Sequence, residues 1–251
     1  MFYSSKFKKF KNVTHCFFSK KGGFSTGIYQ SLNCGRGSSD KKKIVLKNLK
    51  VVSNRIGINL KKLILMNQSH SNKVIIINKN NINIKKFKSD ALVTKMKGFA
   101  LGVVTADCVP IILYDAKNGI IGCVHAGWKG AYSGIIENTI KTFKTLNSNN
   151  RIFASVGPCI GKKSYEVGLD FYKKFLLLSK KNNQYFVSKN KKKKLFNLRK
   201  YVSDKLLNLN VKIDQVNHDT FKEKNNFFSY RRSQKLQEND YGRCISVIGL
   251  I

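Results

Sequence analysis

The sequence contains no apolar stretch that approaches the roughly 20 residues needed to cross a membrane. Its first residues, MFYSSKFKKFKNVTHCFF, also lack the apolar run and small-residue cleavage site of a secretory signal peptide. These absences predict a cytoplasmic protein with no membrane partner. Its six cysteines are therefore expected to be thiols, because six cysteines in a 251-residue chain do not indicate a disulfide framework.

Acidic residues are scarce: 13 Asp and Glu stand against 48 Lys and Arg, for a formal net charge of +35. Such an excess would suit a nucleic-acid partner. Only seven of the cations are arginines, however, and the lysines are spread through every segment together with Asn and Ile. A nucleic-acid groove concentrates arginine and aromatic residues on one face. We therefore interpret the charge as a compositional drift and the dense run at 188–194 as a solvated loop. A basic RNA-associated protein remains the non-enzyme alternative.

Apolar residues are plentiful, at 42% of the chain, so the protein should be globular throughout. Short runs rich in Val and Ile follow one another between residues 63 and 125, with turn residues between them. They predict six strands, at 63–67, 73–77, 90–94, 99–107, 109–115 and 120–126. Several of these runs do not alternate apolar and polar residues, which predicts burial on both faces.

The pattern changes after residue 126. Ile136, Ile140 and Phe143 have the spacing of one helix face, so a strand should end at His125 and a glycine-rich loop should lead into a helix. Further strands are predicted at 151–157, 211–216 and 244–250, and further helices around 169–180 and on the face formed by Leu195, Leu198, Val202 and Leu206. Helices and strands without strict βαβ alternation indicate the α+β class. We expect a single domain over residues 1–251, with mixed β-sheets packed with helices.

Histidine is also scarce, with four in the chain, yet two of them stand where a predicted strand gives way to a turn. His70, Cys108 and His125 share this placement, and strand ends can converge on one rim of a sheet. Two imidazoles and one thiolate are the three protein ligands of a catalytic zinc site, whose fourth position stays open. Two alternatives remain. Cys108 can be a small core residue, or Cys108 and His125 can be the thiolate and base of a cysteine hydrolase or transferase.

Several longer motifs extend this interpretation. They are NQSH at 67–70, DALVT at 90–94, GVVTADCVPIIL at 102–113, VHAGWKG at 124–130, VGPCIG at 156–161, SYEVG at 164–168, and FFSYRR with a later GR near the C-terminus. In this order they resemble the laccase-domain family of polyphenol oxidase type, whose members act as purine nucleoside phosphorylases. The stretch KKGGFSTGIYQSLNCGRGSSD at 20–40 resembles the opening signature of that family, so the match runs nearly end to end.

The resemblance implies a metal bound by His70, Cys108 and His125. It also implies phosphorolysis of adenosine, inosine, guanosine and methylthioadenosine to free base and sugar 1-phosphate, with adenosine deamination as a secondary activity. The partners would be a purine nucleoside and phosphate, and the protein would be a monomer or a small homo-oligomer. The His-x-Glu and Pro-Cys-x-x-Cys motifs of zinc deaminases are absent, so deamination rests on the resemblance alone.

In phosphorolysis, phosphate attacks the anomeric carbon while the sugar gains positive charge, so the site must hold an anion and exclude water. The candidate substrate-binding residues are Lys20 with the amides of Gly22 and Gly23, Lys129, Arg231 or Arg232, and Asn67. Asp107 is a candidate general acid or base beside the metal, or a hydrogen-bonding group that orients a ligand. Trp128 is expected to pack beneath the loop rather than to stack on a base.

This chain departs from the family at several positions. Lys20 and Lys129 stand where the family usually has arginine, which removes bidentate anion geometry. Ser71 replaces a glycine after the first histidine, and a Cys-Thr pair is replaced in NHDTF at 217–221.

The choice of metal follows from the ligand inventory. Four histidines cannot ligate the clusters of a multicopper oxidase. A single copper with Met66 as a weak ligand, in a phenol oxidoreductase, is an alternative, but zinc suits an open catalytic site better.

Overall fold

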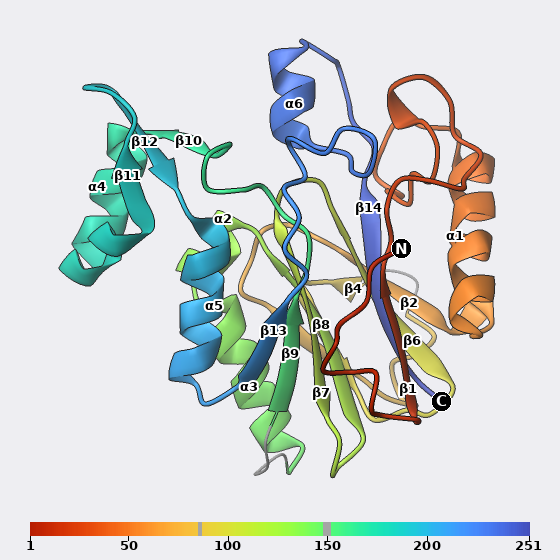
Figure 1. Ribbon diagram of the computed structural model, residues 1–251. Helices are drawn as coiled ribbons and strands as arrows, with labels where there is room; N and C mark the ends of the chain where they lie inside the picture. The colour runs from red at the N-terminus through yellow and green to blue at the C-terminus, as the bar shows by residue number, and fades with distance from the viewer. Residues whose placement is uncertain (85–86, 148–151) are drawn as a thin grey trace.

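The computed structural model of this chain describes residues 1–84, 87–147 and 152–251. Two β-sheets lie face to face at the centre, and helices cover the outer face of each (Figure 1). Helix α1 (Lys42–Ile56) covers one sheet, and α3 (Ile135–Thr145) and α5 (Leu198–Asn208) cover the other. This arrangement confirms the α+β class with mixed sheets and packed helices.

The sheet under α1 has five strands in the order β1-β14-β6-β2-β4. They are β1 (Val13–Phe17), β14 (Cys244–Leu250), β6 (Phe99–Thr105), β2 (Leu63–Asn67) and β4 (Phe87–Lys88). Strand β14 pairs antiparallel with β1 and with β6, whereas β2 runs parallel to both of its neighbours. The two ends of the chain are therefore neighbours in one sheet.

The second sheet has six strands in the order β13-β9-β7-β8-β5-β3. They are β13 (Lys212–Gln215), β9 (Ile152–Val156), β7 (Val109–Asp115), β8 (Ile120–Ala126), β5 (Ala91–Thr94) and β3 (Val74–Ile77). Every residue of β5, β7 and β8 is buried. Along β7, Ile111 packs toward the helices and Ile112 toward the other sheet, because successive side chains point to opposite faces. The predicted burial on both faces is confirmed.

A smaller sheet of β10 (Glu166–Gly168), β12 (Lys193–Phe196) and β11 (Phe186–Ser188) projects from the body together with α4 (Leu169–Leu178) (Figure 1). The placement of Leu195 on a helix face is wrong, because Leu195 pairs with Glu166 and Val187 in this sheet. Helix α5 begins at Leu198 instead. The interpretation of 188–194 as a loop is correct only for 189–192, since the rest of the run lies in β11 and β12.

Other predicted boundaries shift slightly. The predicted helix around 169–180 ends at Leu178 and is followed by the 3-10 helix η3 (Lys180–Tyr185). Arg151, the first residue of one predicted strand, lies outside the described residues. Part of the predicted glycine-rich loop after His125 is the short helix α2 (Trp128–Tyr132). The other elements that the pattern did not predict are β1, α1, β4, the small sheet, α6 (Tyr230–Lys235) and the 3-10 helices η1 (Gly27–Tyr29) and η2 (Leu60–Lys62). None of the helices that the structure describes is long and apolar enough to span a membrane.

Candidate metal centre and substrate cavity

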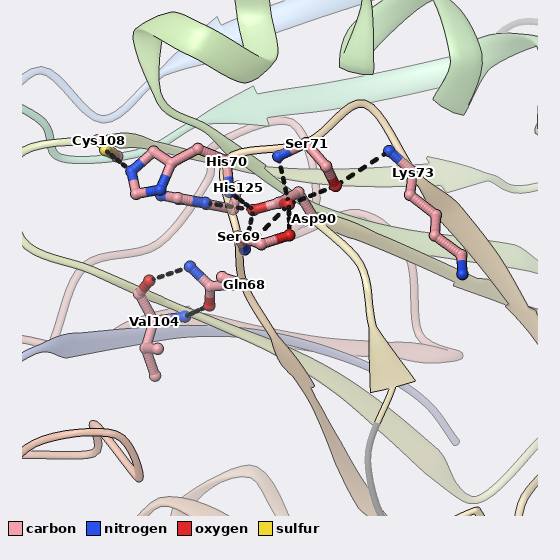
Figure 2. Close-up of polar contacts among 9 residues, drawn as sticks. All are labelled: Gln68, Ser69, His70, Ser71, Lys73, Asp90, Val104, Cys108 and His125. Atoms are coloured by element: carbon pink, nitrogen blue, oxygen red, sulfur yellow. Dashed lines mark hydrogen bonds and ion pairs between the residues drawn. The ribbon is translucent and has the colours of Figure 1, made fainter.

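Three side chains that are distant in the sequence meet at the edge where β2 and β8 end and β7 begins. His70 lies in the loop after β2, Cys108 directly precedes β7, and His125 lies near the end of β8. Their ligand atoms all lie within 4.8 Å of one another. The Cys108 Sγ atom is 3.8 Å from His70 Nε2, and the two imidazole centroids are 4.7 Å apart (Figure 2). Cys108 is also partly exposed, whereas the other five cysteines are buried.

Asp90, which directly precedes β5, organises this cluster (Figure 2). Its buried carboxylate accepts hydrogen bonds from the backbone N–H groups of three consecutive residues, Ser69, His70 and Ser71. These bonds hold His70 at a φ of +59°, in the left-handed region that costs a non-glycine residue about 1–2 kcal/mol. Asp90 begins the DALVT motif, but its residue type and position alone predicted no role for it.

The same carboxylate fixes the orientation of the second histidine. His125 Nδ1 lies 2.8 Å from Asp90 Oδ1, so it donates to the carboxylate and leaves Nε2 to serve as a ligand atom. Burial opposes charge on His125, but the Cys108 thiolate and Asp90 outweigh it and raise the pKa of His125 to about 9. Burial likewise opposes ionisation of Cys108, but His125 and His70 lower the pKa of its thiol to about 6. The Cys108–His125 pair thus favours a thiolate beside an imidazolium, and a bound metal would take the place of the proton on His125 Nε2.

Gly127 lets the backbone approach this cluster closely. A Cβ atom at this position would lie 2.8 Å from His70 Cδ2 and 3.0 Å from Cys108 Sγ, both too close for a carbon contact. The φ of Gly127 is −69°, a value that any residue adopts, so the glycine is required by space rather than by backbone conformation. The glycine in VHAGWKG is thus part of the construction of the site.

The donor set fits a divalent transition metal. In a tetrahedral zinc site a sulfur and a nitrogen ligand stand about 3.6 Å apart, as follows from bond lengths of ~2.3 and ~2.05 Å. The observed Cys108 Sγ to His70 Nε2 distance of 3.8 Å is close to this value. Within residues 1–84, 87–147 and 152–251, no fourth His, Cys, Asp or Glu joins the group. A bound ion would therefore keep one position open.

The other two histidines do not belong to the cluster. His15 is buried, its Nε2 accepts the N–H of Ser4, and burial lowers its pKa to about 4. His218 Nδ1 lies 3.0 Å from the carboxylate of Glu223. With two histidines committed elsewhere, the chain cannot build the histidine-rich cluster of a multicopper enzyme.

The three candidate ligands line a cavity of about 590 Å³. Apolar side chains of β2 and β6, including Leu65, Met66 and Val104, form part of its wall. Asn67, a predicted substrate-binding residue, also lines it, as do Arg36, Tyr241 and Arg243, which the sequence analysis did not select. The signal for the two arginines was present, because they stand in the motif stretches NCGRG and GR.

Four of the predicted substrate-binding residues do not line this cavity. Lys20 lies 5.6 Å above the Phe228 ring, and Lys129 is exposed beside the Trp128 ring. A Cβ atom on Gly23 would lie 2.4 Å from the Leu32 backbone, so Gly23 serves loop packing. Arg231 Nη1 donates to the Glu166 carbonyl at 2.7 Å. The binding roles of all four remain predictions. Trp128 packs against Phe171 of α4, with ring centroids 4.8 Å apart.

Asp107 stands beside Cys108 in the chain with a φ of +84°. Its buried carboxylate accepts hydrogen bonds from the hydroxyls of Thr220 and Ser229 and from the N–H of Arg231. Burial raises the pKa of this carboxyl, while these donors oppose the increase. Among the described residues, none of its hydrogen bonds goes to a cluster side chain. The geometry favours a positioning role, in which Asp107 holds the turn that presents Cys108.

An α+β sandwich with a His-Cys-His cluster at a strand edge defines a protein with a candidate catalytic metal centre. The chain belongs to the family described as multi-copper polyphenol oxidoreductase laccase, whose profile matches residues 14–251. This confirms the family resemblance seen in the sequence.

Curated relatives and solved structures match almost the whole chain. A purine nucleoside phosphorylase of Haemophilus influenzae is 33% identical over 241 residues, which cover 95% of this chain and 94% of the relative. Purine nucleoside phosphorylase YfiH of Escherichia coli is 30% identical over 242 residues, covering 96% and 95%. A Neisseria meningitidis crystal structure superposes with a TM-score of 0.84 at 30% identity, covering 96% and 95%. The Bacillus licheniformis YfiH structure gives 0.89 at 26% identity, covering 97% and 95%.

Proposed function

We propose that this chain is a zinc-dependent purine nucleoside phosphorylase that acts as one catalytic domain. The observation that carries the proposal is the cluster of His70, Cys108 and His125, which opens on a cavity of about 590 Å³ in a chain whose curated relatives are named purine nucleoside phosphorylase. That volume lies within the 300–1,000 Å³ typical of small-molecule sites. Its substrates would be phosphate and a purine nucleoside such as inosine, adenosine, guanosine or methylthioadenosine.

The reaction forms a bond between a phosphate oxygen and the anomeric carbon while the bond from that carbon to the purine nitrogen breaks. The electron pair of the broken bond leaves with the base, which takes up a proton, and the ribose is positively charged in the transition state. When bound, zinc would supply a Lewis acid with one open coordination position. Asp90 orients His125 and His70, and the apolar wall of Leu65 and Val104 limits the access of water.

We further propose zinc rather than copper, because the three ligands and open position suit a catalytic zinc site. Met66 lines the cavity, so a single copper ion with a weak sulfur ligand is the alternative that metal analysis decides. The proposal includes a cytoplasmic location, a monomer or small homo-oligomer, and adenosine deamination as a secondary activity.

A second candidate function is favoured by the hydrogen bond between Asp90 and His125. Thiolate, imidazole and carboxylate in series form the Cys-His-Asp arrangement of cysteine hydrolases. In that enzyme His70 would have no required role and metal removal would leave turnover unchanged. In the phosphorylase, chelation would abolish turnover.

The test is a screen of purine nucleosides with and without phosphate, using untagged protein of measured metal content. We expect about one zinc ion per chain and release of hypoxanthine from inosine only when phosphate is present. Cys108→Ala and His125→Ala should each lower this release by at least ~100-fold, since each removes a metal ligand. Full activity in metal-stripped protein, or near-normal turnover in either variant, would contradict the proposal. Ammonia release from adenosine without phosphate would identify the deaminase activity.

A further inference from the structure

Two arginines line the cavity that contains the His-Cys-His cluster. Arg36 lies in the loop before α1, and Arg243 directly precedes β14, so they come from opposite ends of the chain. The segments before these two elements lie near each other in the fold (Figure 1). Neither arginine has a role in the sequence-based assignment of the site.

Asn33 joins the two segments that carry these arginines. Its buried side-chain oxygen accepts the N–H of Gly35 at 3.0 Å and the N–H of Arg243 at 2.9 Å. The N–H of Cys34 also donates to the carbonyl of Arg243 at 3.0 Å. A Cβ atom on Gly35 would lie 2.9 Å from Arg243 Cδ and 3.2 Å from its Nη1 atom, so the loop that carries Arg36 is packed directly against the Arg243 side chain.

The charge of this cavity is unusual for so lysine-rich a chain. The sequence holds 41 lysines and seven arginines, yet two arginines and none of the described lysines line the cavity. No lysine, aspartate or glutamate of the part of the chain that the structure describes lines the cavity. Arg243 Nη2 forms a long ion pair with Asp240 Oδ1 at 3.8 Å, and among the described residues no ion pair of Arg36 is recorded. Two guanidinium groups therefore face the space with at most partial neutralisation.

Each guanidinium group is held in place by hydrogen bonds that use only some of its N–H donors. Arg36 Nη2 donates to the carbonyl of Leu65 at 3.2 Å, and Arg243 Nη1 donates to the carbonyl of Tyr241 at 3.0 Å. Arg243 also stacks on the Tyr241 ring, 4.1 Å from its centroid. A guanidinium carries five N–H donors. Further donors thus remain on both groups, and their geometry suits tetrahedral oxyanions, which arginine binds in bidentate fashion.

We infer that Arg36 and Arg243 form a subsite for a phosphoryl dianion in the cavity that contains the metal cluster. The inference rests on the proposed function, because it names the groups that hold the anionic substrate of that site. It assigns anion binding to these two arginines in place of Lys20, Lys129 and Arg231. The phosphoryl group is either inorganic phosphate, the attacking substrate, or the phosphate ester of a nucleoside.

The experiment measures equilibrium binding by titration calorimetry with three probes: inorganic phosphate, inosine and inosine 5′-monophosphate. The proteins are the unmodified chain, Arg36→Gln, Arg243→Gln, both Arg→Lys variants, and Lys50→Gln as a charge-matched control on the exposed side of α1. We expect each Gln variant to weaken phosphate binding at least ~10-fold, since a charged bidentate contact is lost. Each Lys variant should lose less, inosine binding should change less than twofold, and Lys50→Gln should match the unmodified chain.

The outcomes separate the two sources of the anion. If the arginine variants weaken inosine 5′-monophosphate binding but not phosphate binding, the subsite is shown to take a phosphate ester. If neither phosphorylated probe is affected, if inosine weakens equally, or if Lys50→Gln produces the same loss, the inference is overturned. Should a Gln variant fail to fold by circular dichroism, the corresponding Lys variant decides.

The same proteins distinguish this inference from the proposed function. Arginine-dependent phosphate binding in a chain that cleaves no nucleoside would refute the phosphorylase and keep the subsite. Phosphorolysis whose KM for phosphate is unchanged in both Gln variants would keep the phosphorylase and refute the subsite.

Discussion

The His-Cys-His cluster and the arginine pair lie on the wall of one cavity, but each is held by a different kind of side chain. Asp90 gathers backbone N–H groups of the His70 loop and the Nδ1 atom of His125. Asn33 gathers backbone N–H groups of the Arg36 loop and of Arg243. One organising group is an anion and the other is neutral.

The charge of the ligand that each group would bind, a metal cation in one case and an anion in the other, explains this difference. A carboxylate behind a histidine fixes the tautomer and increases the basicity of the nitrogen that faces a metal. A carboxylate behind two arginines would instead neutralise the charge that attracts an anion. An amide oxygen accepts the same backbone hydrogen bonds without adding a negative charge to those already present at Asp40, which accepts from Asn33 Nδ2 at 3.0 Å, and at Asp240, 3.8 Å from Arg243 Nη2.

Of the three substitutions that test this comparison, Asp90→Asn should have the largest effect, a loss of zinc affinity. This variant keeps one acceptor oxygen but loses the charge and one acceptor, so His70 and His125 are held less firmly. We expect zinc affinity to fall about 10- to 100-fold, as for other residues that hydrogen-bond to metal ligands. Competition with a chromophoric chelator measures it. Asp204→Asn, which removes a carboxylate from an exposed pair with Lys200, should leave zinc affinity unchanged. An unaltered affinity in Asp90→Asn would refute the role given to Asp90.

A smaller effect is expected from Gly127→Ala, which inserts a methyl group against His70 and Cys108. Zinc affinity should fall about 10-fold, because exposed His70 can move partly aside. Gly168→Ala is a matched control. Gly168 also caps a helix, with φ −75° and ψ 170° against −69° and 163° for Gly127, but its Cβ would meet no atom within 4 Å. Equal zinc affinities in the two variants would show that Gly127 does not shape the site.

The smallest effect is expected from Asn33→Asp, which places a carboxylate behind the arginine pair, as Asp90 lies behind the His-Cys-His cluster. The added carboxylate should weaken phosphate binding about threefold to tenfold, since a screened charge pair contributes on the order of 1–2 kcal/mol and the loop also loses the amide that donates to Asp40 Oδ2 at 3.0 Å. Asn59→Asp adds the same charge at an exposed cap, where Asp serves as well as Asn. If Asn33→Asp binds phosphate as tightly as Asn59→Asp, the charge of the side chain behind the arginines does not affect anion binding, and the comparison is refuted.

Much of the fold could be predicted because a buried strand has an apolar composition that is visible in a short stretch of sequence. Strands β7 and β8 match their predicted ranges, 109–115 and 120–126, since uninterrupted apolar runs of this length suit a strand buried on both faces. Leu195 was misplaced because its apolar spacing also fits a helix, and pairing with Val187 and Glu166 determined the outcome. Such pairing is a non-local property.

The residues predicted for the candidate site also divide into those that the structure brings together and those that it places elsewhere. His70, Cys108 and His125 were predicted from their rare residue types at strand ends together with the family motifs, and the structure brings their ligand atoms within 4.8 Å of one another. Lys20 and Lys129 were selected by charge and motif, but neither lines the cavity. A cationic residue in a loop gives no local sign of the direction in which its side chain points.

Residue chemistry and family motifs indicated the candidate metal ligands, and hydrophobic runs indicated the buried strands, because all of these depend on short stretches of chain. Only the tertiary structure decided which loops meet. Asp90 reaches His70 and His125, and Asn33 reaches Arg243, through hydrogen bonds between segments that are separated by about 20 to 210 residues. Those bonds exist because two sheets pack face to face and bring the ends of β2, β6 and β8 and the starts of β7 and β14 to one edge.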